Sequence, residues 1–267
     1  MSAHTADTFL ERIVAARRAA VARAQIETPR PVPQAARPGA FLSALDAVGP
    51  DRVAVIAELK RVSPANGALS TDRDPVALGA AYRAGGAAAL SVLTEPEFFG
   101  ARADDLSRCR AAAALPVLRK DFVVDPWQLE ETAAMGAEAV LLMVVVLGAE
   151  TGRYAERALE LGIEPFVEVH TAAEMDLALE SPARIIGINN RDMRTFEVVA
   201  GAARRLAPRA AAAGRRPIAL SGIRGPGDLA GLREEGIVGV LVGESLMRAP
   251  DPQAAVRALA EAPADVR

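Results

Sequence analysis

Short apolar runs recur along this chain between residues 53 and 242, and longer stretches rich in Ala, Leu, Arg and Glu separate them. The runs are continuously hydrophobic, as expected for parallel strands whose two faces are both covered. The longer stretches have the length and composition of helices, so the pattern indicates repeated strand-helix units. We predict strands at 53–58, 87–93, 116–119, 138–143, 164–168, 185–189, 217–220 and 238–242.

Eight strand-helix units are the content of a closed (β/α)8 barrel, which normally uses about 250 residues. The chain has 267 residues, enough for one barrel with an extension. A doubly wound open sheet is the alternative. It is disfavoured because Gly85 and Gly86 precede a predicted strand instead of following one, so the dinucleotide-binding pattern is missing. We therefore predict the α/β class and a (β/α)8 TIM barrel.

The start of the chain has a different pattern. Apolar residues at helical spacing predict an amphipathic helix over about 5–26. A proline-rich stretch at 28–38 cannot continue this helix and predicts an extended linker. We assign 1–46 to an N-terminal helical extension with its linker, and 47–267 to the barrel.

Charge and composition exclude several kinds of partner. The net charge is -3, the sequence pI is about 5.6 and the positive charges are dispersed, so we expect no nucleic-acid surface. The most apolar stretch, 137–147, is too short to span a bilayer, and no targeting segment is evident, so we expect no membrane partner. The chain is compatible with a monomer.

The residues that often bind metals or form disulfides are scarce. Cys109 is the single cysteine, which excludes an internal disulfide and favours a reducing compartment, the cytoplasm. It lies in an alanine-rich helical segment and is interpreted as a structural thiol. The two histidines, His4 and His170, lack metal-ligand spacing, so no metal site is predicted.

Polar side chains stand where the predicted strands end, and a parallel barrel gathers those ends at one face. Glu58 and Lys60 are two residues apart, so both point toward the barrel mouth, although a simple ion pair at the rim is the alternative. Lys120 follows the third strand and can stay charged near an anionic ligand and donate a proton. Arg119 has the opposite strand parity and is interpreted as a surface residue.

Two later strand ends also carry polar groups. Glu168 has no cationic neighbour in sequence, so its carboxylate needs a partner from elsewhere in the fold. Asn189 and Arg191, again two residues apart, offer donors that suit an anionic ligand, although both types also cap loops. His170 is interpreted as a loop histidine rather than a catalytic base.

Glycines follow the last two predicted strands, where backbone N–H groups can approach a phosphate. The predicted cradle consists of Ser221, Gly222, Gly243 and Glu244. The long loop at 61–74 after the first strand is typical of a mobile lid at the same face. Ser63 in this loop can donate to an anion, or it can be an ordinary turn residue before proline.

Several of these motifs together resemble one family. The segments AELKRVSPANG, LPVLRKDF, FVEVH, IGINNRDM and VGESLMR are similar to indole-3-glycerol phosphate synthase and occur in the family's order from about residue 55 to residue 248. The resemblance implies a carboxy-lyase of tryptophan biosynthesis. Its small-molecule substrate, 1-(2-carboxyphenylamino)-1-deoxyribulose 5-phosphate, would be closed to indole-3-glycerol phosphate with loss of carbon dioxide and water. No cofactor and no metal are implied.

The resemblance also implies roles for the strand-end residues. Lys120 would be the general acid that protonates the ketone oxygen, and Glu168 the general acid/base of the later dehydration. Lys60 would lie near the phosphate and hydroxyls, with Glu58 holding the lysines in place. The other implied site residues are Phe122 against the aromatic ring, Asn189 and Arg191 in substrate placement, and Ser63, Ser221, Gly222, Gly243 and Glu244 around the ring or phosphate.

One strand end departs from the family pattern. Members usually carry glutamate before Ser-Gly-Ile, whereas this chain has Leu220, which can neither accept a proton nor bind an amine. Two alternatives therefore stay open: a divergent paralogue that closes a related arylamine sugar phosphate, and a non-catalytic barrel that binds a phosphate ligand. The retained acid, base and phosphate groups argue against the second.

Overall fold

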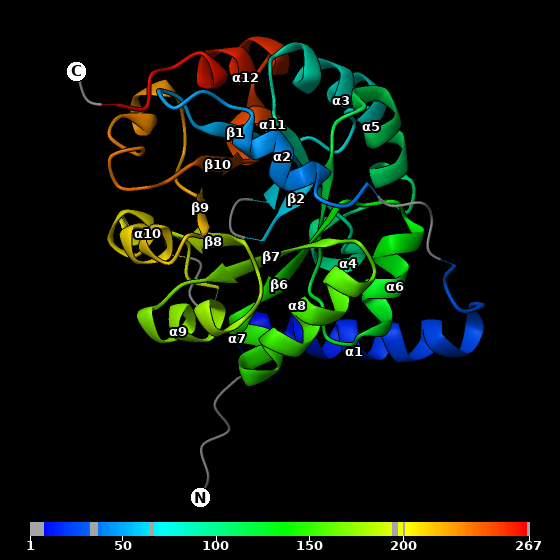
Figure 1. Ribbon diagram of the computed structural model, residues 1–267. Coiled ribbons are helices and arrows are strands. Elements are labelled where there is room, and N and C mark those ends of the chain that lie inside the picture. Colours follow the sequence, from blue (N-terminus) through cyan, green and yellow to red (C-terminus); the bar gives the residue numbers. More distant parts are fainter. Residues whose placement is uncertain (1–7, 33–36, 65–66, 194–196, 200, 266–267) are drawn as a thin grey trace, which may run out of the picture.

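The computed structural model describes residues 8–32, 37–64, 67–193, 197–199 and 201–265. Its centre is a closed barrel of parallel strands in the order β1-β10-β9-β8-β7-β6-β5-β4 (Figure 1). Closure through the pairing of β1 with β4 excludes the open doubly wound sheet and confirms the predicted barrel. The strands are β1 (Ala54–Leu59), β4 (Ala89–Leu93), β5 (Val117–Lys120), β6 (Ala139–Met143), β7 (Glu164–Val169), β8 (Ile185–Asn189), β9 (Arg216–Leu220) and β10 (Gly239–Val242), each within two residues of its predicted bounds.

Helices surround the barrel (Figure 1). Several begin at local signals in the sequence: Asp74 and Asp251 each accept a backbone hydrogen bond at the start of a helix whose first residue is proline. The longer helices are α3 (Pro75–Ala84), α5 (Asp105–Ala113), α6 (Trp127–Ala134), α8 (Thr151–Glu160), α9 (Ala172–Glu180), α10 (Ala202–Ala212) and α12 (Pro252–Ala260). Shorter turns are α4 (Pro96–Phe99), α7 (Val144–Leu147), η1 (Gly148–Glu150), η2 (Pro226–Leu229) and α11 (Glu244–Arg248).

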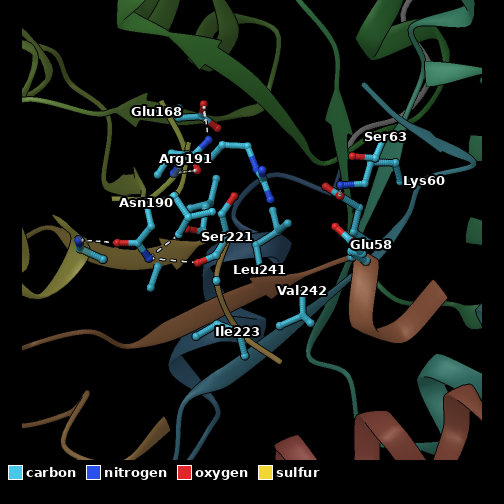
Figure 2. A pocket seen from close by; sticks show the side chains of 18 of the residues that line it. Glu58, Lys60, Ser63, Glu168, Asn190, Arg191, Ser221, Ile223, Leu241 and Val242 are labelled. Carbon is cyan, nitrogen blue, oxygen red and sulfur yellow. Dashed lines mark hydrogen bonds and ion pairs between the residues drawn. The ribbon is translucent and has the colours of Figure 1, made fainter. Parts of the chain in front are cut away.

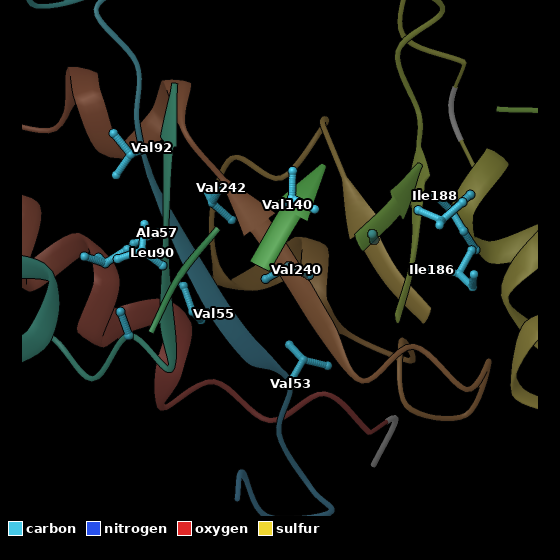
Figure 3. Packing of buried hydrophobic residues seen from close by; sticks show 14 of the residues in the cluster. Val53, Val55, Ala57, Leu90, Val92, Val140, Ile186, Ile188, Val240 and Val242 are labelled. Carbon is cyan, nitrogen blue, oxygen red and sulfur yellow. The ribbon is translucent and has the colours of Figure 1, made fainter. Parts of the chain in front are cut away.

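Side chains alternate between the two faces of each strand, so the buried apolar residues form two cores. Val55 and Ala57 face outward and pack with residues of the surrounding helices (Figure 3). Ala54 and Ile56, the alternate residues of β1, belong to a second cluster inside the barrel. Because both faces of each strand are buried, its hydrophobic run is continuous rather than alternating.

The N-terminal helix was predicted correctly as an element. It runs as α1 (Phe9–Glu27) and begins with a capping box in which Thr8 and Glu11 bond each other's backbone N–H groups. It packs beside α6 (Figure 1). Residues 28–32 of the predicted linker have no helical or strand structure, and the middle of the linker lies outside the described residues.

A second short helix covers the opposite end of the barrel, where the strands begin. In α2 (Ala40–Asp46), the fully buried Phe41 packs edge-on against Phe166 of β7, with ring centroids 6.5 Å apart. Asp46 accepts a hydrogen bond from Arg216 at the first residue of β9. This end is therefore closed by packing, and the open end is the one that carries the predicted site residues.

The loop after β1 folds back as a small hairpin of β2 (Val62–Ser63) and β3 (Gly67–Ala68). Arg61 anchors its base through a buried ion pair with Asp105, with Nε 2.9 Å from Oδ2. Movement of this loop as a lid stays a prediction. Within the described part of the chain, no helix is both long and apolar enough to cross a membrane.

Candidate active site

A cavity of about 970 Å³ lies at the open end of the barrel. Figure 2 shows Glu58, Lys60 and Ser63 on one side of this cavity and Glu168 and Asn190 on the other. The barrel thus brings together groups that are far apart in the sequence. The predicted site residues that line the cavity are Glu58, Lys60, Ser63, Lys120, Phe122, Glu168, Asn189, Arg191, Ser221, Gly222, Gly243 and Glu244.

Glu58 and Lys60 stand at the end of β1 and form an ion pair, with Lys60 Nζ 3.4 Å from Glu58 Oε1. The other oxygen of Glu58 accepts a hydrogen bond of 3.1 Å from Ser91 Oγ on the neighbouring β4. Glu58 is almost fully buried, whereas the Lys60 side chain is partly exposed to the cavity. The Lys60 ammonium is therefore held at the cavity by the Glu58 carboxylate, which is itself held by Ser91.

Lys120 at the end of β5 and Glu168 on β7 form an ion pair in the wall of the cavity. Lys120 Nζ lies 3.9 Å from Glu168 Oε2, while Glu168 Oε1 accepts a hydrogen bond of 3.1 Å from Asn189 Nδ2. Burial of Glu168 opposes ionisation, but the charge of Lys120 and the contacts with His170 and Asn189 outweigh it and lower the carboxyl pKa to about 2. Glu168 is therefore a carboxylate at neutral pH.

Lys60 and Lys120 are the only lysines in the sequence. The other strongly basic side chains are all arginines. A lysine can donate a proton at accessible pH, whereas an arginine stays protonated. Both lysines of the sequence lie at this cavity.

The far side of the cavity is formed by the ends of β9 and β10. Ser221 and Gly222 both have left-handed backbones, with φ of 61° and 85°, and such a conformation is strained for the serine. Asn190 Nδ2 holds this turn by donating to the carbonyls of Leu220 and Ser221 at 3.2 and 3.0 Å. The sequence interpretation did not assign Asn190, whose importance depends on this contact between β8 and β9.

Gly243 precedes α11, whose N-terminus has no side-chain cap in the described structure. Gly243, Glu244 and Ser245 at this helix start all line the cavity. The Glu244 carboxylate pairs with Arg248 at 3.2 Å. A carboxylate repels a phosphate, so Glu244 can contribute only its backbone N–H to the predicted cradle.

The prediction for Arg119 was wrong. Its side chain points away from the cavity, as its parity indicated, but it is only 2% exposed and bonds to Gln128 and Thr132 of α6, which packs over this side of β5. Its Nη2 lies 3.0 Å from Asp121 and 2.6 Å from Glu131, and Asp121 also binds Arg17 of α1 at 2.9 Å. Arg119 is therefore part of a buried ionic network directly behind Lys120.

The sequence also predicted a structural thiol at Cys109 and a loop histidine at His170. Cys109 is fully buried as a structural thiol, and burial raises its pKa to about 12. His170 follows β7 as predicted for a loop residue, but it contacts both Glu168 and Glu174. Among the described residues, no group of three or more His, Cys, Asp or Glu side chains is arranged to hold a metal ion.

A closed parallel barrel with paired acidic and basic groups at its strand ends has the architecture of a (β/α)8-barrel enzyme. Comparison with known proteins narrows this class. The profile of the family "Indole-3-glycerol phosphate synthase" matches residues 10–259. The chain therefore belongs to the indole-3-glycerol phosphate synthase family.

Individual relatives agree with this assignment. An indole-3-glycerol phosphate synthase of Aromatoleum aromaticum is 42% identical over 94% of this chain and 98% of its own length. That of Mycolicibacterium gilvum is 43% identical over 98% of this chain and 95% of its own length. Thiamine phosphate pyrophosphorylase from Pyrococcus furiosus shares the fold alone, with a TM-score of 0.57 at 15% identity over 79% of this chain and 95% of that chain.

Proposed function

We propose that this protein is an indole-3-glycerol phosphate synthase. It would convert 1-(2-carboxyphenylamino)-1-deoxyribulose 5-phosphate to indole-3-glycerol phosphate, carbon dioxide and water. Family membership over nearly the whole chain supports the reaction. The observation in the site that carries the proposal is the ion pair of Lys120 and Glu168, 3.9 Å apart, in the wall of a cavity large enough for a small phosphorylated substrate.

Charge complementarity supports the proposed substrate. It carries a phosphate and a carboxylate, and Lys60, Lys120 and Arg191 present cationic groups to the same cavity. Phosphate would bind at the Ser221–Gly222 turn and the start of α11, which both line the cavity and can offer backbone N–H groups to an anion. The aromatic ring would pack on Phe122, which is backed by Phe99 at a centroid distance of 5.8 Å.

The first chemical step is carbon–carbon bond formation. The aromatic carbon bonds to the ketone carbon while Lys120 donates a proton to the ketone oxygen. The bond to the carboxylate then breaks, and its electron pair restores the aromatic ring as carbon dioxide leaves. Asn189 and Arg191 would hold the substrate in the geometry that this attack requires.

The second stage is dehydration. The new hydroxyl takes up one proton and leaves as water, and one proton is lost from the neighbouring carbon of the new ring, so the two proton transfers balance. Glu168 would accept the proton lost from carbon, because its pKa of about 2 makes it a carboxylate when the substrate binds. Glu58 would keep Lys60 in place beside the leaving hydroxyl and phosphate. In this proposal residues 47–267 carry the chemistry and residues 1–46 form the extension.

The test is a fluorescence assay for indole-3-glycerol phosphate with the purified full chain. We expect Lys120→Ala to lower kcat by at least about 100-fold, within the range of general acid catalysis. Lys120→Arg is the matched control, because it keeps the positive charge but cannot act as an acid. Wild-type activity in Lys120→Arg would contradict the assigned role, and an inactive wild type that binds the substrate would favour the non-catalytic alternative.

A further inference from the structure

His170 lies between two carboxylates at the end of β7. Its Nε2 is 3.4 Å from Glu168 Oε1, the separation of an ion pair. Its Nδ1 is 3.0 Å from Glu174 Oε2 in the first turn of α9, and the same oxygen accepts a hydrogen bond of 2.7 Å from the His170 backbone N–H. Thr171 caps this helix by accepting from the Glu174 N–H at 3.2 Å. The imidazole is thus held from its outer side and directed at Glu168.

The charges around the imidazole favour its protonated form. Burial opposes protonation, but contacts with Glu168 and Glu174 outweigh burial and raise the pKa of His170 to about 9. Lys120 from β5 is the other ionisable group facing Glu168, while Asn189 from β8 contributes a neutral amide and Arg191 projects into the same cavity (Figure 2). The adjoining β6 and α7 contribute the apolar residues Met143 and Val144–Leu147.

The two oxygens of Glu168 have different surroundings. Oε1 receives the Asn189 amide and faces His170. Oε2 accepts no hydrogen bond from the described residues and lies 3.9 Å from Lys120 Nζ. His170 and Asn189 together therefore occupy one oxygen and leave the other, which is buried, facing Lys120.

We propose that His170 is a positioning residue for Glu168, held in place by Glu174, and that it keeps the carboxylate ionised with Oε2 turned toward Lys120. This inference rests on the proposed role of Glu168 as the base of the dehydration. In this proposal the Glu174–His170 pair acts on Glu168 and makes no contact with the substrate.

The first test is an NMR titration of the imidazole. The chain has only two histidines, and His4 lies outside the described residues, so His4→Gln leaves a single histidine signal. We expect His170 to titrate near pH 9 in this background, and Glu168→Gln and Glu174→Gln each to lower its pKa by about one unit or more. Glu180→Gln, at the exposed end of the same helix, is the matched charge control and leaves the titration unchanged.

The second test is kinetic. We expect His170→Leu to lower kcat about 10- to 100-fold with KM changed less than about threefold, because a misdirected base affects the chemical step. His170→Gln retains an N–H donor without the charge and recovers most of kcat at pH 7. In both variants the acid limb of the rate profile moves to higher pH, because Glu168 loses a neighbouring positive charge and its pKa rises.

Two results would overturn the inference. One is a His170 pKa near 6.5 that Glu168→Gln and Glu174→Gln leave unchanged. The other is an equal kcat loss in His170→Gln and His170→Leu with no shift of the acid limb, which indicates packing alone; circular dichroism and thermal melting identify misfolded variants. An inactive wild type would contradict the proposed function instead, while the titration still decides whether His170 and Glu168 are paired.

Discussion

Gly243→Ala is expected to damage catalysis by moving Glu58 rather than by straining the backbone. Gly243 has φ of -119°, which alanine can adopt. A Cβ built at this position would overlap Glu58 Oε1 and lie 3.1 Å from its Cδ and 3.3 Å from its Cβ. The glutamate side chain is enclosed by β1, β4 and β10, so it has little room to move away.

The size of the effect follows from these distances. Non-bonded carbon atoms prefer separations of about 3.5–4.0 Å, so the Glu58 carboxylate must shift by about 1 Å. That shift disturbs its contacts with Ser91 and Lys60, which are now 3.1 and 3.4 Å. A misplacement of this size can cost up to about 100-fold in rate, or about 2.7 kcal/mol of transition-state stabilisation. The expected loss of folding stability is about 1 kcal/mol, at the lower end of overpacking effects.

The assay is the fluorescence measurement of kcat and KM, combined with urea unfolding. We expect kcat to fall 10- to 100-fold with a smaller change in KM; a rise in KM alone would indicate a disturbed phosphate cradle. Gly152→Ala in α8 is the control, because a Cβ there meets no atom within 4 Å. The reasoning would be refuted if Gly243→Ala cost the same factor in a Glu58→Ala background, where no carboxylate remains to be displaced.

Two further substitutions address the wall and the support of the site. Leu220→Glu is expected to raise kcat/KM about tenfold, because it restores the family's proton acceptor. It is also expected to lower the melting temperature, because a charge would be buried at a position that is only 2% exposed. Leu220→Gln is the uncharged control, and no gain in rate would indicate that neighbouring groups already compensate. Arg17→Leu is expected to lower the free energy of unfolding by about 2 kcal/mol, since it leaves buried Asp121 with Arg119 as its remaining ion-pair partner. Urea unfolding measures this loss, and an equal effect of Arg18→Leu on the exposed face of the same helix would contradict it.

Most of the fold and much of the site could be predicted from the sequence because both depend on local patterns. Continuous apolar runs at regular spacing indicate parallel strands covered on both faces, and the barrel follows from their number. Strand parity assigned Glu58 and Lys60 to the cavity side and Arg119 to the opposite side, as the structure has them. The (β/α)8 topology then places the strand ends at one face without further information.

Only the tertiary structure decided which residues cover, hold and orient that site. Arg119 is buried against α6, and Asp121 pairs with Arg17 of α1, more than 100 residues away in the sequence. His170 gains its significance from the two carboxylates on either side of it. Parity is a property of a single strand, whereas burial and charge pairing depend on separate elements meeting in space, which short-range sequence patterns do not encode.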